Sequence, residues 1–305
     1  MASSGTAAKI YEKLENIRDC CSVIPLSPLE EDRLLRELIN VDRRLRTRDY
    51  TIHSHNTGTF NLVERNRDFF TELQFHSSMG RTWEKVLDGV QLSSHRAILD
   101  LCPGYFPKIE LALLYKNYRG EVRAINKDGE ALEQMNQFLK MFNAPFTFSY
   151  TVSDLLDASD KFEPASLLLG NHIIDDIYID FFGRELGFSS TELYSDQDLL
   201  ERFWRCILKE STLRRGAVVS YLVEALGALT AERAEVVLVQ YPSYIERQLG
   251  IQEVSDLHLR TLREIEIALV QDGFVSKTSA LESRLDNPAM RFNAEHCLHV
   301  VRHKR

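Results

Sequence analysis

The stretch "ILDLCPGYFPK", residues 98–108, decides the fold that we expect for this chain. An apolar run ends at Asp100, a short Pro/Gly loop follows, and "KIELALLY" then has the pattern of a helix. A strand, a loop and a helix in this order form the place where many α/β proteins hold a nucleotide-like cofactor. A dinucleotide fingerprint needs three glycines, but only Gly104 is present, and Cys102 and Phe106 stand where the first and third would fall. The loop therefore argues against a bound pyrophosphate and favours a ligand that has no phosphate.

Short apolar runs alternate with helical patterns from residue 96 onward. This alternation predicts an α/β fold with a seven-stranded, mostly parallel sheet wound on both faces by helices. The last two runs are joined by residues 282–293 without a helix, so we expect the last strand to be antiparallel. Residues 231–250 are expected as an insertion after the fifth strand that adds to a lid or forms a homodimer contact. The strands are expected at 97–102, 120–126, 146–152, 165–171, 216–225, 274–281 and 294–304.

The N-terminal region shows Leu and Ile at spacings of three and four, which is typical of helices. We expect two domains, a helical cap at 1–90 and a sheet domain at 91–305. The cap is expected to act as a lid over a small substrate. Its aromatic and histidine residues are candidates to line that lid, and Tyr50 and Arg81 are candidates for substrate contacts, Arg81 meeting a carboxylate. The candidate lining residues are Tyr50, His53, His55, Phe75, His76 and Trp83.

Composition restricts the partners and the compartment. The 305 residues carry 37 basic and 45 acidic side chains, a formal net charge of −8, which disfavours general nucleic-acid binding. Five cysteines, an odd number, show no metal-ligand spacing and fit reduced thiols in the cytoplasm. No signal peptide or membrane-spanning stretch is expected. We therefore expect a cytoplasmic protein with no metal, no nucleic acid and no membrane partner.

Polar residues follow four successive strands. Ligands of such sheets bind outside the carboxyl ends of the strands, so these residues are the candidate site. Each also has an ordinary structural interpretation, because Asn and Asp commonly cap helices and turns. In chain order they are Asp100, Cys102, Pro103 and Gly104, then Asn126 and Lys127, then Ser153 and Asp154, and finally Asn171, Asp175 and Asp176.

Taken together, these motifs resemble those of class I S-adenosylmethionine-dependent methyltransferases. "ILDLCPGYF" resembles the first motif of that family, an acid followed by GxGxG, although two of the glycines are replaced. "VRAINKDGEAL", "VSDLL" and "SLLLGNHIIDDI" resemble the next three, and the likeness covers residues from about 80 to 305.

The resemblance implies S-adenosylmethionine as cofactor and a role for each strand end. Asp100 and the Gly104 loop would hold the methionine part, and Asn126 would replace the ribose-binding acid. Ser153 and Asp154 would lie beside the adenine, and Asn171 beside the transferred carbon.

Three functions remain open from the sequence. The first is N-methylation of a small amine or amino-acid-like substrate, with Asn171 orienting the amine and Asp175 or Asp176 accepting its proton. The second is cleavage of the other carbon–sulfur bond, because "PGYFP" resembles the loop of nicotianamine-synthase-like enzymes. Those enzymes transfer the aminocarboxypropyl arm, and a related outcome is its closure to azetidine-2-carboxylate. The third is a methyltransferase-like binding subunit without catalysis.

Overall fold

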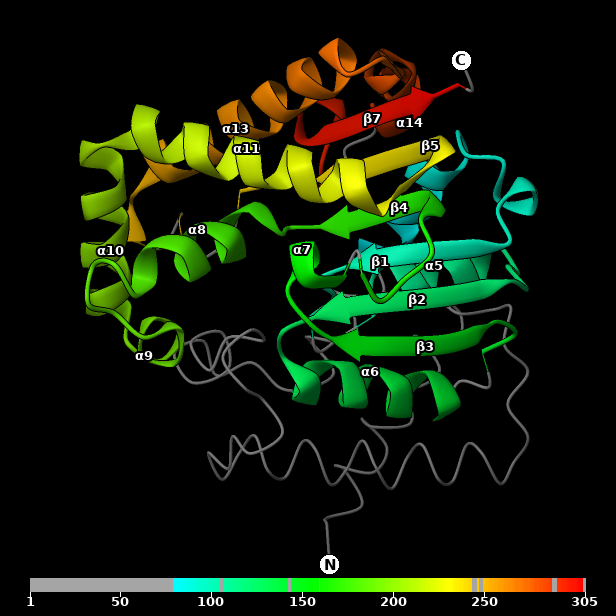
Figure 1. Cartoon of the computed structure of the whole chain (residues 1–305), viewed down its shortest axis with the longest axis horizontal. Coiled ribbons are helices and arrows are strands. Elements are labelled where there is room, and N and C mark those ends of the chain that lie inside the picture. Colours follow the sequence, from blue (N-terminus) through cyan, green and yellow to red (C-terminus); the bar gives the residue numbers. More distant parts are fainter. Residues whose placement is uncertain are drawn as a thin grey trace, which may run out of the picture.

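The structure is a computed structural model of the whole chain, drawn in Figure 1. Tyr50 and the other candidate lid residues before Met79 lie outside the described residues. Within the described part, no helix combines the length and apolar character needed to cross a bilayer. The described residues are 79–104, 107–141, 144–158, 160–242, 246, 249–286 and 290–303.

Seven strands form one sheet in the order β3-β2-β1-β4-β5-β7-β6. β1 to β5 run parallel, whereas β7 pairs antiparallel with both β5 and β6. The predicted fold class, a mostly parallel seven-stranded sheet with an antiparallel last strand, is confirmed. The strands are β1 (Ala97–Leu101), β2 (Glu121–Asn126), β3 (Thr147–Val152), β4 (Ala165–Asn171), β5 (Thr230–Val239), β6 (Phe274–Ser276) and β7 (Cys297–Arg302).

Helices cover both faces of the sheet. On one face, a helix over residues 79–87 packs with α5 (Ile109–Tyr115) and α6 (Gly129–Met141) in one apolar cluster. On the other face, a second cluster contains side chains of α7, α8, α10, α11 and α13. Burial of these two apolar layers is the main favourable term in the stability of the fold. The second set comprises α7 (Leu155–Ala158), α8 (Ile174–Gly183), α9 (Ser190–Ser195), α10 (Gln197–Lys209), α11 (Ser211–Leu229) and α13 (Gln252–Gln271).

The fifth strand differs from the sequence prediction. Residues 216–225 belong to the helix α11, and the strand β5 is formed by Thr230–Val239, within the segment expected as an insertion. The buried residues Val218, Leu222 and Ala225 recur at helical spacing, a period that the apolar run hides. β5 lies between β4 and β7, so both of its faces are covered and it reads as the continuous run "VVLV".

The last two strands are shorter than predicted. β6 is followed by a 3-10 helix, η4 (Thr278–Leu281), and by α14 (Glu282–Leu285). β7 is preceded by a 3-10 helix, η5 (Ala294–His296). β6 is an edge strand with one neighbour, so little holds it in extended form beyond Ser276. A further 3-10 helix, η3 (Leu92–Ser94), precedes β1.

Candidate active site

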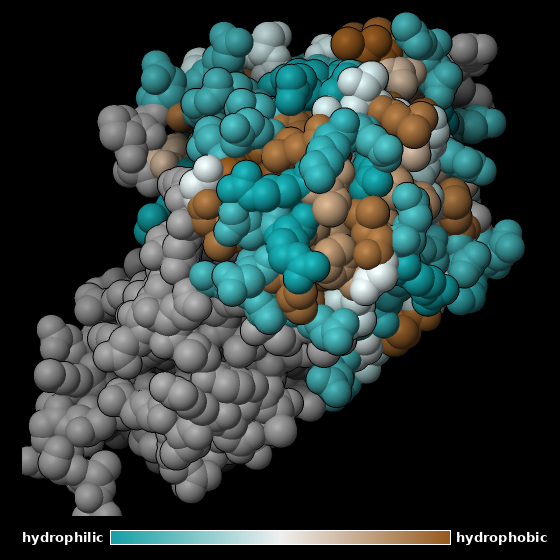
Figure 2. Space-filling model, turned by 90° about the vertical axis from the view of Figure 1, so that its left-hand side faces the viewer, coloured by the Kyte–Doolittle hydropathy of each residue, from teal (hydrophilic) through white to brown (hydrophobic). Residues whose placement is uncertain are grey.

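The carboxyl ends of β1 to β4 meet at one edge of the sheet. Leu101 pairs with Ile125 of β2 and with Gly170 of β4, and Asn126 pairs with Val152 of β3. The arrowheads of β2, β3 and β4 accordingly point the same way in Figure 1, toward the end where α8 and α10 lie. Figure 2 views the molecule from that end, where apolar and polar residues interleave over the described surface. The predicted site residues that follow β1 to β4 therefore lie at one edge of the sheet.

The loop after β1 keeps a glycine-like backbone although its first glycine is absent. Cys102 has φ +52°, in the left-handed region that costs a side chain roughly 1–2 kcal/mol. Its backbone N–H donates to the Ile125 carbonyl at 2.7 Å. Asn126 Nδ2 donates to the Pro103 carbonyl at 2.7 Å, so Asn126 fastens this loop to the end of β2. Among the described residues, a Cβ added to Gly104 would come within 4 Å only of Lys108 Nζ.

A buried pair of carboxyl groups lies beneath the loop. Asp100 and Glu110 are each 1% exposed. Burial, reinforced by Glu110, raises the pKa of Asp100 well above its usual range. Glu110 was not predicted as a site residue, because an acid in the first turn of a helix usually interacts with the helix dipole.

The charges around the loop come from two helices. Burial lowers the pKa of Lys108, the residue before α5, and four carboxyl groups oppose that shift, Asp176 of α8 most strongly. Burial also raises the pKa of the Cys102 thiol, with Asp176 as the next cause. These effects favour the protonated thiol of Cys102 at neutral pH.

Ion pairs engage the polar residues at the ends of β2 and β3. Asp154 accepts hydrogen bonds from Tyr221 Oη at 2.7 Å and from the Leu156 N–H at 2.9 Å. Lys127 Nζ lies 2.8 Å from Asp154 Oδ2 and also pairs with Asp180. Burial alone would raise the pKa of Asp154, but the hydrogen bonds from Lys127 and Tyr221 lower it. Ser153 Oγ accepts from Lys161 Nζ at 2.9 Å.

Asn171, at the end of β4, is held by aromatic side chains. Its Oδ1 accepts from Nε1 of the fully buried Trp83 at 2.8 Å, and its Nδ2 donates to Tyr241 Oη at 3.4 Å. The rings of Tyr241 and Phe292 stack with centroids 5.7 Å apart. Trp83, a candidate lid residue, thus lies in the core and contacts the candidate catalytic amide.

The two acids after Asn171 face different neighbours. Asp175 Oδ1 lies 2.9 Å from Nδ1 of His172, whose Nε2 lies 2.7 Å from the Tyr241 carbonyl. Burial alone would lower the pKa of His172, but Asp175 raises it to about 9, so this ring is an imidazolium at neutral pH. Gln240 Nε2 donates to the same Asp175 carboxylate at 3.4 Å. Asp175 is therefore part of a partly buried ion pair, whereas Asp176 acts electrostatically on Lys108 and Cys102.

Arg81 was predicted to contact the substrate. In the structure it contacts side chains of its own helix and of α5. Its Nη1 pairs with Glu84 at 3.0 Å, and its guanidinium lies 3.7 Å from the centroid of the Tyr115 ring. These contacts place Arg81 between the 79–87 helix and α5.

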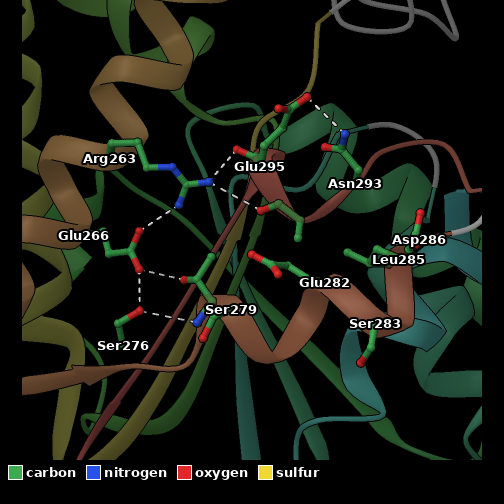
Figure 3. Close-up of a pocket in the computed structure, with 12 residues that line it drawn as sticks. Arg263, Glu266, Ser276, Ser279, Glu282, Ser283, Leu285, Asp286, Asn293 and Glu295 are labelled. Carbon is green, nitrogen blue, oxygen red and sulfur yellow. Dashed lines mark hydrogen bonds and ion pairs between the residues drawn. The ribbon is translucent and has the colours of Figure 1, made fainter.

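A separate polar hollow of about 990 Å³ lies at the β6 edge of the sheet (Figure 3). Arg263 donates to the carbonyls of Cys297 and Glu295, and Glu266 accepts from Ser276 and Thr278. These interactions tie α13 to β6, β7 and η5, so the hollow's main charged groups have structural partners. Among the described residues, no group of three or more His, Cys, Asp or Glu is arranged to hold a metal ion.

The strand order and the antiparallel β7 define the fold of the class I S-adenosylmethionine-dependent methyltransferases, and this chain has that fold. No family model matches the chain, and no curated protein matches it.

The solved structures that resemble this chain have low sequence identity to it. The plantazolicin methyltransferase BpumL, solved with SAH, is 11% identical with a TM-score of 0.42, over 96% of this chain and 99% of that one. PH0851 is 17% identical with a TM-score of 0.41, over 73% of this chain and 45% of that one, so this chain spans less than half of its length. A putative O-methyltransferase from Nostoc punctiforme PCC 73102 is 9% identical with a TM-score of 0.40, over 74% and 56%. The fold assignment rests on the sheet and not on these matches.

Proposed function

We propose that this chain is an S-adenosylmethionine-dependent transferase that N-methylates a small amine or an amino-acid-like substrate. The observation that carries the proposal is the loop after β1. It follows the buried Asp100, keeps a left-handed backbone at Cys102, and leaves Gly104 with only Lys108 Nζ near its Cβ position among the described residues. A backbone that a ligand approaches closely is the reason for glycine in such loops.

The residues present fit the methionine part of this cofactor better than its adenosine part. The acids around the loop suit a cation, and Glu110 Oε1 is a buried acceptor with no hydrogen-bond partner. When bound, the cofactor supplies an activated methyl group on a sulfonium. In this proposal Asp176 accepts the proton of the attacking amine, and Asn171 orients that amine through its amide. Asp175 then has a positioning role through His172.

A second candidate, a binding subunit without catalysis, is favoured by a different observation. The side chains of Asn126, Asp154 and Asn171 each already have protein partners. A ligand that uses them must displace those partners, and a buried group that loses a hydrogen bond costs about 1–3 kcal/mol.

Calorimetry with S-adenosylmethionine and S-adenosylhomocysteine tests the proposal. We expect heat with both ligands, and loss of that heat in Gly104→Val, whose Cβ would come within 4 Å only of Lys108 Nζ among the described residues. Gly227→Ala, also in open space but on α11, is the matched control and should bind normally. Absence of heat with either ligand in the unaltered chain contradicts the transferase proposal and favours a scaffold.

Mass spectrometry after incubation with candidate amines then identifies the bond that is cleaved. S-adenosylhomocysteine as product supports methyl transfer. Methylthioadenosine would contradict methyl transfer and would support cleavage of the bond to the aminocarboxypropyl arm. Binding without either product supports the non-catalytic subunit.

A further inference from the structure

We propose that His172 is a positioning residue of the candidate active site. Its ring clamps the Tyr241 backbone to Asp175 of α8, and this clamp holds the Tyr241 side chain against the amide of Asn171. The inference rests on the proposed function for the purpose of the clamp, because in that function Asn171 orients the substrate amine. The clamp is made by groups of the chain alone, so it can be tested without a ligand.

Three contacts of His172 join the turn after β4 to the end of β5. Its backbone N–H donates to the Val239 carbonyl at 2.7 Å, and its Nε2 lies 2.7 Å from the Tyr241 carbonyl. Its Nδ1 lies 2.9 Å from Oδ1 of Asp175, which belongs to the first turn of α8. The side chain of His172 therefore bridges to a segment that lies 69 residues away in the chain.

The backbone of His172 has an uncommon conformation. Its φ is +60°, in the left-handed region that residues other than Gly, Asn and Asp seldom adopt. Such a conformation persists where the surrounding contacts fix it, and it is concentrated at functional sites. A strained turn directly after Asn171 is therefore an observation, independent of the ring contacts, that His172 serves the site.

The clamp requires a proton on both ring nitrogens of His172. Burial would raise the pKa of Asp175, but His172 lowers it, so Asp175 is a carboxylate. A carboxylate and a backbone carbonyl only accept hydrogen bonds, so each of the two nitrogens must donate. Burial alone would lower the pKa of His172, but Asp175 raises it to about 9. Above that pH one of the two oxygens loses its donor, and the clamp opens.

The groups around the ring favour the protonated form. Three acids act on the ring, and two basic groups act on those acids in turn. Burial raises the pKa of the neighbouring Tyr241 hydroxyl, which stays neutral. The acids are Asp175, Asp176 and Glu246, and the basic groups are Lys108, which acts with Asp175, and His258, whose Nδ1 lies 3.0 Å from Glu246 Oε1.

The clamp reaches Asn171 through the side chain of Tyr241. The Tyr241 ring lies 4.6 Å from the His172 ring, measured between centroids, and it stacks on Phe292. Its Oη accepts from Asn171 Nδ2 at 3.4 Å, and Asn171 Oδ1 accepts from Trp83 Nε1 at 2.8 Å. An indole N–H only donates, so the Trp83 contact fixes which end of the amide faces Tyr241. A change at His172 should therefore reach the indole N–H of Trp83.

That indole N–H gives a measurement in the free chain. The chain has two tryptophans, so a ¹⁵N–¹H spectrum shows two indole peaks, and Trp204→Phe identifies the peak of the fully buried Trp83. We expect this peak to shift with a midpoint at about pH 9, as the clamp opens. In His172→Asn it should not titrate there, because asparagine tolerates the left-handed backbone but has no titrating group. Tyr241→Phe, which lacks the hydroxyl, should lose most of the shift.

His299→Asn is the matched control for the loss of a buried histidine. His299 Nε2 lies 3.1 Å from Glu235 Oε2, and its backbone N–H donates to Thr278, so its contacts lie outside the candidate site. This variant should keep the titration of the Trp83 peak.

Calorimetry with S-adenosylhomocysteine shows what the clamp does for the site. At neutral pH we expect His172→Asn to weaken binding by about 10-fold, the effect of losing one hydrogen bond to a charged group, and His299→Asn to leave it unchanged. Above pH 9 the affinity of the unaltered chain should approach that of His172→Asn. A purely structural role of His172 would not produce this convergence, and titration of the ligand amine affects both chains equally.

The outcomes separate the clamp from the proposed function. A Trp83 peak that does not titrate in the unaltered chain, or that titrates equally in His172→Asn, overturns the clamp whatever the ligand does. Equal affinity of the two chains at every pH overturns its role in the site. Absence of binding by the unaltered chain overturns the proposed function and that role together, while the Trp83 peak still decides whether His172 holds Asn171.

Discussion

Replacing Cys102 by Gly tests whether the loop after β1 is held in a glycine conformation. Cys102 has φ +52°, and its N–H is fixed to the Ile125 carbonyl. A side chain in this region costs roughly 1–2 kcal/mol, which glycine avoids. Glycine also loses more conformational entropy on folding, and the replacement removes the contacts of the thiol with the apolar cluster.

The matched variant Cys102→Ala isolates the backbone effect, because both variants lack the thiol. Glycine at position 102 avoids a backbone strain of about 1–2 kcal/mol, but it loses about 0.4–1 kcal/mol more conformational entropy on folding than alanine. Cys102→Gly should therefore be more stable than Cys102→Ala by roughly 0.5–1 kcal/mol. The stability difference between the Gly and Ala variants has the opposite sign at an ordinary helical position. At Cys206 in α10, Ala should be more stable than Gly by about 1 kcal/mol.

Urea unfolding followed by circular dichroism gives the four free energies. A Gly variant at position 102 that is less stable than its Ala counterpart, while position 206 behaves as expected, would show that the left-handed backbone is not maintained. The loop after β1 would then lack the backbone conformation that the proposed cofactor site requires.

Two partly buried ion pairs make the stability of the chain depend on pH. The pKa of His172 is about 9 in the folded chain against 6.5 for an ordinary histidine, so its contribution to stability is complete below pH 6.5 and is lost as pH rises toward 9. Thermal melts should show this loss, roughly 1–3 kcal/mol, and His172→Gln should abolish it. Glu235 contacts His299 and His95, which lower its pKa from 4.5 to about 2 against the opposing effect of burial. Its contribution should be complete above pH 4.5 and should fall away toward pH 2, and a Glu235→Gln variant with an unchanged acid profile would refute the assignment.

Local patterns were sufficient to predict most of the sheet. β1 to β4 were found because each is a short apolar run bounded by turn residues, and the acid or amide after each run marks a strand end. The fifth strand was misplaced because a buried helix and a buried strand both appear as apolar runs, and only the pairing of β5 with β4 and β7 distinguishes them. The placement of the candidate residues at one edge followed from parallel strands alone.

What those residues contact depends on groups far away in the chain. Asn171 accepts from Trp83, 88 residues earlier, and Asp154 accepts from Tyr221, 67 residues later. Glu110 raises the pKa of Asp100 because both side chains are buried. The sequence shows Glu110 only as an acid in the first turn of a helix. The sequence by itself determined which segments form β1 to β4 and that the sheet is mostly parallel with an antiparallel last strand, because hydrophobic periodicity and turn residues are local properties. The tertiary structure alone decided which polar groups are satisfied, paired or left without a partner, because hydrogen bonds and burial depend on distances between segments that are remote in the chain.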